Sequence, residues 1–485
     1  MRPEVAGKTD GVTQLLQPDI CVIGGGSGGL SVAAGAAAFG VPVLLIERGR
    51  MGGDCLNYGC VPSKALIAAG RHAHAVRKAA EFGVFAGEPV IDFERVHAHV
   101  RSVIDAVAPN DSVERFTALG VKVVEAEARF VDRDTIEAGG FAIRARRFVI
   151  ATGSSAIVPP IPGIDGVDYL TNETLFDIAR LPEHLVVIGA GPVGLEMAQA
   201  HSRLGAKVTV IEAGRALAKE DTELARIALD RLRGEGITIL ENSRVLSVEK
   251  TGQGVRLRCE TQEGPRTIDG SALLLAAGRK VNTAGLGLDA AGIAETTTGI
   301  AVDASLRTAN RRVYAIGDAT GGPQFTHAAN YHASLVLRQI LFRLPARENR
   351  DIIPRATFTD PEIAAIGLGE EEARKRHGHI DILRWPFAEN DRAQAERTTS
   401  GLIKIIAGRR GKILGAGIVG SGAAEMINMW SMILANGQSL RHLGRAIAPY
   451  PTMTEIGKRA VIAYYAPLTR KPFARAVIRL LRRLG

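Results

Sequence analysis

The most reactive pattern in the sequence is a pair of cysteines, Cys55 and Cys60, with four residues between them. Gly59 relaxes the backbone between the two, so their sulfurs can close a small disulfide ring. The segment opens a helix that carries Lys64, and a helix N-terminus stabilises a thiolate. Two buried, inert cysteines are the alternative, but they would not explain the glycines, proline and lysine around the pair. The pattern therefore predicts a redox-active dithiol.

Cysteine usage in the rest of the chain supports this interpretation. The 485 residues contain only four cysteines, too few for the disulfide framework of a small secreted domain. Residues 1–18 are polar, broken by prolines and glycines, and lack the apolar core of a signal peptide. We therefore expect a flexible N-terminal extension on a cytoplasmic protein, where a close cysteine pair is more often catalytic than structural.

A glycine-rich turn follows the first apolar segment. Residues 19–23 form a short apolar strand, and Gly24, Gly26 and Gly29 follow ahead of an alanine-rich helix. These glycines allow a tight turn, close approach of a pyrophosphate and close packing of helix on strand. Glu47 ends the next strand 18 residues after the last glycine, where a carboxylate binds ribose hydroxyls. The unit predicts a site for a dinucleotide whose adenosine has a free 2′-hydroxyl.

The same unit recurs in the middle of the chain. The strand 185–188 leads into Gly189, Gly191 and Gly194, and Glu212 ends the following strand, again 18 residues after the last glycine. A single GxGxxG is weak evidence, because glycine turns are common for backbone reasons alone. Two copies with matching strands, helices and acidic residues predict two dinucleotide-binding folds.

The acidic residue of the second unit bears on the type of nicotinamide cofactor. The carboxylate of Glu212 would repel a 2′-phosphate, so NADH is favoured over NADPH. Arg215 stands close by in the sequence and leaves NADPH open as an alternative.

Further motifs extend the pattern over most of the chain. They are Ala151-Thr152-Gly153, Ala277-Gly278-Arg279 with Asn282-Thr283, the segment from Tyr314 to Asp318, and the segment from Thr357 to Glu362. Together with the cysteine segment they resemble the pyridine nucleotide–disulfide oxidoreductases, which include lipoamide dehydrogenase, glutathione reductase and mercuric reductase. The resemblance runs from Asp19 to about Ala466.

This resemblance implies an α/β fold with two Rossmann-like dinucleotide-binding domains, for FAD and NAD, and a C-terminal α+β dimerisation domain in a homodimer. The NAD domain is expected to be inserted into the FAD domain. The expected boundaries are 1–18 for the extension, 19–156 and 280–353 for the discontinuous FAD-binding domain, 157–279 for the NAD(P)-binding domain, 354–469 for the dimerisation domain and 470–485 for a basic amphipathic helix.

The resemblance also implies roles for single residues. Cys60 would lie against the flavin as the charge-transfer thiolate, and Cys55 would face the substrate and perform interchange. Lys64 and Glu196 match a buried ion pair beside flavin N5, where an unpaired charge would be costly. Asp318 would bind the FAD ribityl chain, and a helix beginning at 327–330 would direct its N-terminus at the flavin O2 edge. The residues expected at FAD are Gly24, Gly26, Gly29, Glu47, Gly53, Lys64, Thr152, Gly153, Asp318, His327 and Ala328, and those expected at NAD are Gly189, Gly191, Gly194, Glu212 and Gly278.

The sequence departs from the family near its C-terminus. Lipoamide dehydrogenase and glutathione reductase carry a histidine there, which enters the partner subunit's active site as acid–base catalyst, but this chain has Tyr450 followed by Pro451. Tyrosine, with a reference pKa near 10, is a poor base at neutral pH, whereas histidine, at about 6.5, moves protons in both directions. We expect each active site to receive Tyr450 and Glu455 from the other subunit and to exchange slowly with lipoamide or glutathione.

Three hypotheses describe the electron acceptor. In the favoured one, Cys55 attacks a small disulfide, persulfide or other sulfur compound while Tyr450 donates a hydrogen bond. In the second, the acceptor is a mercuric or other metal ion, or a quinone. Mercuric reductases also lack the histidine, but they carry a C-terminal cysteine pair, whereas no cysteine follows Cys259 here. In the third, the chain is a redox-responsive binding flavoprotein with little turnover, against which the complete catalytic set argues.

Other features predict neither a resident metal nor a nucleic-acid partner. The pairs His72/His74 and His97/His99 lie in helical patterns, where residues two apart point in different directions. The net charge of +9 would suit nucleic acid, but it is partly concentrated at the C-terminus. No apolar run approaches the roughly 18 residues of a membrane span.

The C-terminal segment has two distinct faces. A helical wheel places the residues Phe473, Val477, Leu480, Leu481 and Leu484 on one side, and Arg475, Arg479, Arg482 and Arg483 opposite. We expect this helix to pack on its own dimer with a solvated arginine face. The alternative is peripheral contact with an anionic membrane, at its inner face, or with an acidic partner.

Overall fold

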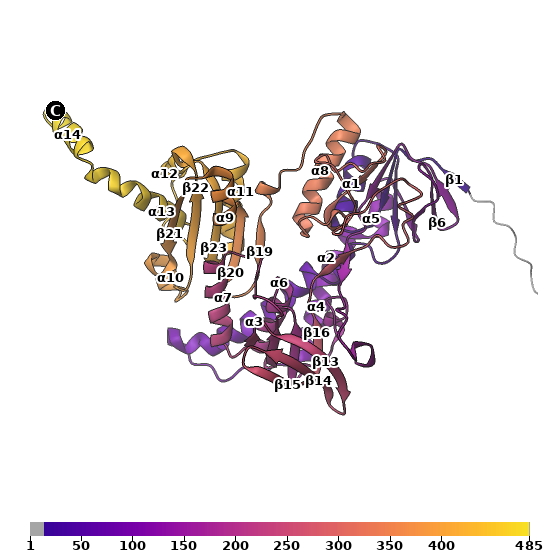
Figure 1. Ribbon diagram of the computed structural model, residues 1–485, viewed down its shortest axis with the longest axis horizontal. Coiled ribbons are helices and arrows are strands. Elements are labelled where there is room, and N and C mark those ends of the chain that lie inside the picture. The colour runs from indigo at the N-terminus through magenta and orange to yellow at the C-terminus, as the bar shows by residue number, and fades with distance from the viewer. Residues whose placement is uncertain (1–13, 485) are drawn as a thin grey trace, which may run out of the picture.

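The computed structural model describes residues 14–484, which form three lobes (Figure 1). Of the expected extension 1–18, residues 1–13 lie outside the described residues. The strand β1 (Gln14–Leu16) pairs in parallel with β7 (Phe141–Ile143), so these three residues belong to a sheet instead of a flexible extension. A strand of three residues is too short to show a periodicity in the sequence.

The first lobe is built on a parallel sheet with the order β18-β8-β2-β3-β4. Its strands are β2 (Ile20–Ile23), β3 (Val43–Glu47), β4 (Val121–Glu125), β8 (Arg147–Ile150) and β18 (Val313–Ala315). The helices α1 (Ser27–Ala37) and α8 (Thr326–Phe342) pack together on one face. A smaller sheet of β1, β7, β5 (Arg129–Phe130) and β6 (Ile136–Ala138) covers the other face.

Burial of the central sheet on both faces explains the uninterrupted apolar sequence of β2. Ile20 and Val22 pack with the helices, and the alternate residues Cys21 and Ile23 pack with the smaller sheet. All four side chains are at most 4% exposed. A strand in this position therefore needs apolar residues at every position instead of a polar alternation.

The helix that begins at Cys60 extends from the first lobe to the second. The helices of this region are α2 (Gly53–Asn57), α3 (Cys60–Lys78), α4 (Phe93–Val107) and α5 (Val113–Ala118). Helix α3 packs along α6 (Pro192–Leu204) of the second lobe. At this crossing a Cβ atom on Gly70 would lie 3.2 Å from the carbonyl oxygen of Ala200, so the two helices approach closely.

The second lobe repeats the parallel βαβ arrangement. Its sheet has the order β12-β11-β10-β16, with β10 (His184–Ile188), β11 (Lys207–Ile211), β12 (Thr238–Leu240) and β16 (Ala272–Leu275). An antiparallel sheet of β13 (Arg244–Thr251), β14 (Gly254–Thr261) and β15 (Gly264–Gly270) lies beside it, and α7 (Thr222–Gly234) follows β11. The strands β9 (Ser154–Ala156) and β17 (Arg279–Val281) form an antiparallel ribbon through which the chain leaves and re-enters the first lobe. The second lobe is thus an insertion.

The third lobe is an antiparallel sheet covered by helices. Its strands, in spatial order, are β19 (Arg355–Thr357), β20 (Glu362–Gly367), β23 (Ile413–Gly420), β22 (Leu402–Ala407) and β21 (Asp381–Pro386). The helices are α9 (Glu370–His377), α10 (Asp391–Ala395), α11 (Ala423–Ala435), α12 (Leu440–Arg445) and α13 (Glu455–Tyr465). Trp430 of α11 is buried at the centre of this α+β core.

The chain ends in an amphipathic helix that projects from the third lobe (Figure 1). The 3-10 helix η9 (Ala466–Arg470) leads into α14 (Pro472–Leu481), which begins with proline, a residue favoured in the first turn. Among the described residues, no helix is long and apolar enough to cross a membrane.

Candidate active site

The two glycine turns have the same backbone geometry. Gly24 and Gly189 have φ angles of 106° and 109°, which favour glycine. A Cβ atom on Gly29 would lie 1.9 Å from the carbonyl oxygen of Gly24, and one on Gly194 would lie 2.0 Å from that of Gly189. These four glycines are therefore required by the fold itself, before any ligand binds.

The middle glycine of each turn has a different reason to lack a side chain. A Cβ atom on Gly191 would meet nothing within 4 Å, and one on Gly26 would meet only the Cα atom of Gly53, at 3.9 Å. Both glycines precede the first turn of a helix, α1 or α6, whose free N–H groups attract an anion. The open space fits the pyrophosphate of a dinucleotide, so the residues present suit FAD at the first turn and NAD at the second.

The two predicted ribose-binding glutamates are held by equivalent hydrogen bonds. The carboxylate of Glu47 accepts hydrogen bonds from the backbone N–H groups of Gly25 at 2.5 Å and Gly49 at 2.6 Å. The carboxylate of Glu212 accepts them from Ala190 at 2.8 Å and Gly214 at 3.0 Å. Each carboxylate is thus fixed at the carboxyl end of its parallel sheet, where dinucleotides bind.

The cysteine pair lies at the junction of α2 and α3. Cys55 is partly buried and Cys60, the first residue of α3, is exposed. The Sγ atom of Cys60 lies 3.4 Å from Oγ1 of Thr326, at the start of α8. Helix α8 therefore begins one residue before the predicted 327–330 segment and directs its first side chain at a cysteine.

The two thiols differ in acidity because they share one hydrogen bond. The hydrogen bond from Cys55 is the main reason that the pKa of Cys60 falls to about 6, with Thr326 and Lys64 also lowering it against the opposing effect of burial. The same bond and burial raise the pKa of Cys55 far above its usual range. At neutral pH the reduced pair is therefore a Cys60 thiolate with a Cys55 thiol donating to it.

Lys64 and Glu196, from different lobes, form a close ion pair. The Nζ atom of Lys64 lies 2.8 Å from Oε2 of Glu196, whose carboxylate is buried and also accepts a hydrogen bond from the backbone N–H of Phe358 at 2.9 Å. The same ammonium lies 4.2 Å from the centroid of the Phe358 ring. Lys64 lies one helical turn after Cys60 in α3. Its positive charge lowers the pKa of Cys60 and so favours the thiolate.

Asp318 belongs to a polar cluster that includes residues not predicted as site residues. Its carboxylate accepts a hydrogen bond from the hydroxyl of Ser154 at 2.6 Å, and burial raises its pKa. Arg279 donates to the Ser154 backbone carbonyl at 2.6 Å and pairs with Asp54 at 3.2 Å. Arg279 thus connects the re-entry ribbon to the cysteine-bearing segment. Its place in the Ala277-Gly278-Arg279 motif was the available signal.

The other predicted FAD residues are distributed around the same edge of the first sheet. The hydroxyl of Thr152 donates to the carbonyl of Asn282 at 2.7 Å, and Gly153 has a φ angle of 69° with open space beside it. His327 Nε2 lies 2.7 Å from the carbonyl oxygen of Pro354, and Ala328 is fully buried. Gly278, predicted for NAD, has a φ angle of 124°.

Tyr450 and Glu455 lie in the third lobe. The Tyr450 side chain is 67% exposed, and its hydroxyl donates to the carboxylate of Asp391 at 3.0 Å. This bond raises the pKa of Tyr450, so the phenol remains a proton donor at neutral pH. Glu455 begins α13. Asp391, which sequence reasoning missed, therefore orients the Tyr450 side chain.

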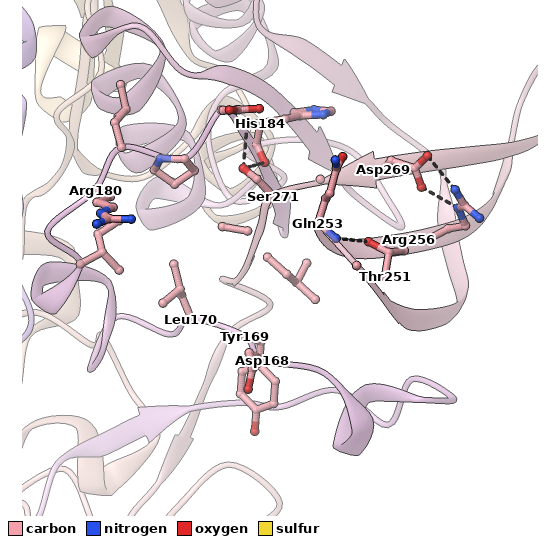
Figure 2. A pocket seen from close by; sticks show the side chains of 18 residues that line it. Asp168, Tyr169, Leu170, Arg180, His184, Thr251, Gln253, Arg256, Asp269 and Ser271 are labelled. Carbon is pink, nitrogen blue, oxygen red and sulfur yellow. Dashed lines mark hydrogen bonds and ion pairs between the residues drawn. The ribbon is translucent and has the colours of Figure 1, made fainter.

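A separate hollow in the second lobe contains none of the predicted site residues. It measures about 1010 Å³ and lies beside the start of β10, where the backbone of His184 and the side chain of Ser271 exchange hydrogen bonds (Figure 2). Asp269 and Arg256 form an ion pair on its other side. Dinucleotides bind at the carboxyl ends of parallel strands, so this hollow is at the opposite edge of the sheet from the NAD site. Among residues 14–484, no group of three or more acidic, histidine or cysteine side chains could hold a metal ion.

Two dinucleotide-binding folds, a cysteine pair with one acidic thiol and a separate α+β lobe define a flavin- and nicotinamide-dependent disulfide oxidoreductase. Residues 18–333 match the family described as pyridine nucleotide-disulphide oxidoreductase, and residues 353–461 match its dimerisation domain. The chain belongs to this family. The family uses FAD and NAD(P)H, and the dimerisation domain implies a homodimer.

Several members of the family are similar over nearly their whole length. The mercuric reductase of Streptomyces lividans is 35% identical over 93% of this chain and 97% of its own. The dihydrolipoyl dehydrogenase of Geobacillus stearothermophilus is 33% identical over 92% and 96%. Among solved structures, LpdA of Mycobacterium tuberculosis superposes with a TM-score of 0.84 at 27% identity, covering 94% of this chain and all of its own. The HOCl-induced flavoprotein disulfide reductase RclA of Escherichia coli gives 0.80 at 28%, covering 92% and 99%.

We predict that the Cys60 thiol of the reduced protein titrates near pH 6 and that Cys55→Ala moves this titration to higher pH, because the Cys55 hydrogen bond contributes most to the lowered pKa. Thr326→Val should produce a smaller rise. Ultraviolet thiolate absorbance measured against pH reports both changes. Cys259→Ser is the control, since burial raises the pKa of that thiol to about 11. An unchanged titration in Cys55→Ala would show that the hydrogen bond is not the cause.

We also predict opposite phenotypes for two neighbouring glycines. Gly194→Ala should destabilise the second lobe by about 1–3 kcal/mol, because its new methyl group overlaps the Gly189 carbonyl. Gly191→Ala should leave stability within about 0.5 kcal/mol but weaken NADH binding at least about tenfold, because its methyl group enters the ligand space. Urea unfolding and an NADH binding titration separate the two effects. Wild-type NADH affinity in Gly191→Ala would place the pyrophosphate elsewhere.

Proposed function

We propose that this enzyme transfers electrons from NADH, through FAD, to a Cys55–Cys60 disulfide and from there to a small sulfur-containing acceptor. The observation that carries the proposal is the position of Cys60, which begins α3 with its Sγ atom 3.4 Å from Oγ1 of Thr326 and one helical turn before the Lys64–Glu196 ion pair. The lowered pKa of Cys60 and the raised pKa of Cys55 agree with this position. Two thiols with separate tasks need this difference in acidity. A cytoplasmic setting suits a dithiol that must be reduced again after each turnover.

The protein's own residues support a complete cycle. The glycine turns at Gly26 and Gly191 would hold FAD and NADH, and bound FAD would supply the transfer of an electron pair from NADH to the disulfide. Reduction in this way would leave the Cys55 thiol and the Cys60 thiolate. The Cys55 proton then moves to Cys60 along their hydrogen bond, and the Cys55 thiolate attacks an acceptor disulfide RSSR, forming a mixed disulfide and releasing RS⁻, which takes the proton from Cys60. The Cys60 thiolate attacks the Cys55 sulfur, releases a second RS⁻ and restores the original disulfide. The sum converts one NADH, one RSSR and one proton from solvent to NAD⁺ and two RSH.

Two neighbouring residues support NADH as the physiological donor. Glu212 is held by two backbone N–H groups at the end of β11, where its charge would repel a 2′-phosphate. Arg215, the residue that could bind such a phosphate, donates instead to the backbone carbonyl of Ala218 at 2.9 Å and to the hydroxyl of Thr222. Use of NADPH would require Arg215 to leave these partners.

Reduction of a soft metal ion is the second candidate. It is favoured by the mercuric reductases among the relatives and by the solved Cu(II) complex of RclA. A thiol and a thiolate side by side are also suitable ligands for a soft ion. Quinone reduction directly from the flavin, and a redox-responsive binding protein with little turnover, are the remaining alternatives.

The first experiment is an anaerobic titration with NADH, followed in the visible spectrum. We expect the wild-type protein to take up two electron pairs and to develop a long-wavelength band from the Cys60 thiolate to the flavin. Cys60→Ser should take up one pair and lack the band, because it has no disulfide and no thiolate at that position. Cys21→Ala is the control, since this buried thiol lies within β2. If wild type and Cys60→Ser behaved alike, the acceptor would receive electrons from the flavin alone.

A second experiment concerns the proton donor at position 450. We predict that Tyr450→His raises the rate of dihydrolipoamide–NAD⁺ exchange about 10- to 100-fold above pH 6.5, where the imidazole is neutral and accepts protons. Tyr450→Phe is the matched control, because it loses the bond to Asp391 without gaining a base. Equal rates for the histidine and phenylalanine variants would show that proton transfer at this position does not limit exchange.

A further inference from the structure

Helix α14 exposes a broad apolar face to solvent. Phe473 at its start and Leu480 near its end are 80% and 60% exposed, and Leu484, three residues beyond the helix, is 76% exposed. No side chain of the helix is buried, and its packing is against η9. A ten-residue helix is marginal in water by itself, so a helix of this composition is stabilised by whatever covers its apolar face.

The charges around this face are all of one sign. After Glu455 the sequence contains no acidic residue. Its basic residues there are Lys458, Arg459, Arg470, Lys471, Arg475, Arg479, Arg482 and Arg483. On the helical wheel, the arginines from 475 to 483 occupy the side opposite Phe473 and Leu480. The complementary surface must therefore be apolar below the helix and anionic along its flanks.

The helix lies outside the part of the chain that the family shares. The match to the dimerisation domain ends at residue 461. The solved relatives are matched over 98–100% of their own chains and over 91–94% of this one. The matched dimerisation domain therefore does not include α14. Two copies of α14 paired through their apolar faces would leave the arginine side of each helix without an acidic partner from the other copy.

We infer that α14 binds the surface of an anionic lipid membrane. The helix lies in the interface plane, with Phe473, Leu480 and Leu484 among the upper acyl chains and the arginines among phosphate headgroups. At about 1.5 Å per residue its ten residues extend about 15 Å, enough to lie on a bilayer and too short to cross one. The helix would hold the third lobe, and with it the Tyr450 end of the active site, close to the membrane.

Co-sedimentation of the full-length holoenzyme with vesicles tests the inference. We expect binding to vesicles of equal parts phosphatidylglycerol and phosphatidylcholine, weak binding to phosphatidylcholine alone, and release by high salt. Replacing Arg475, Arg479, Arg482 and Arg483 by glutamine, or Phe473, Leu480 and Leu484 by serine, should lower binding at least tenfold. Because these side chains are exposed, both variants should fold and keep NADH-dependent flavin reduction.

A matched control removes the same charge elsewhere. It replaces four exposed arginines outside the helix, namely Arg129, Arg180, Arg244 and Arg311, by glutamine, and it should bind anionic vesicles as wild type does. The inference is overturned if the wild-type protein does not sediment with anionic vesicles, or if the control loses as much binding as the arginine variant. It is also overturned if the serine variant dissociates the dimer in light scattering, because α14 would then pack on the second copy.

Discussion

The buried carboxylate of Glu196 joins all three lobes at one point. Glu196 belongs to α6 of the second lobe, and its carboxylate forms an ion pair with Lys64 of α3. The same carboxylate accepts a hydrogen bond from the backbone N–H of Phe358, which directly follows β19 of the third lobe. A carboxylate at this depth is tolerated only with both partners, since an unpaired buried charge is strongly destabilising. The position of each lobe is therefore constrained by the same few atoms that lie beside the cysteines.

The rest of the junction follows from the spacing of residues on α6. Gln199 and Arg203 follow Glu196 on one face of the helix, at intervals of three and four residues. Gln199 exchanges two hydrogen bonds with the backbone of Asp360, and Arg203 pairs with the Asp360 carboxylate at 2.8 Å. One helical face thus holds residues 358–360 in place. These contacts fix the start of the third lobe to the helix that carries Glu196.

Sequence reasoning reached the features that depend on local geometry. The glycines at 24, 29, 189 and 194 are demanded by contacts within their own βαβ units, and Glu47 and Glu212 end strands of those units. Thr326 and Asp391 were missed as site residues because their roles arise from contacts with residues 266 and 59 positions away, which no local pattern encodes. Arg279 stood in a recognised motif, but its contact with Ser154, 125 positions away, could not be read from that motif. The Lys64–Glu196 pair lies across 132 positions, and only the family resemblance pointed to it. The strand β1 was missed because three residues are too few to show the alternation of apolar and polar side chains that indicates a strand.

The same geometry explains how one electron-transfer core can serve enzymes with different acceptors. The dinucleotide turns, the ion pair and the shared thiol proton together produce a thiolate and a thiol, which can reduce a disulfide or bind a soft ion equally well. Selection among acceptors must then come from the groups beside Cys55. The third lobe carries a phenol, Tyr450, which is held by Asp391 and is a proton donor at neutral pH. Under the proposed function the partner's third lobe brings this phenol to Cys55, and such a site best suits an acceptor that needs no base at this position.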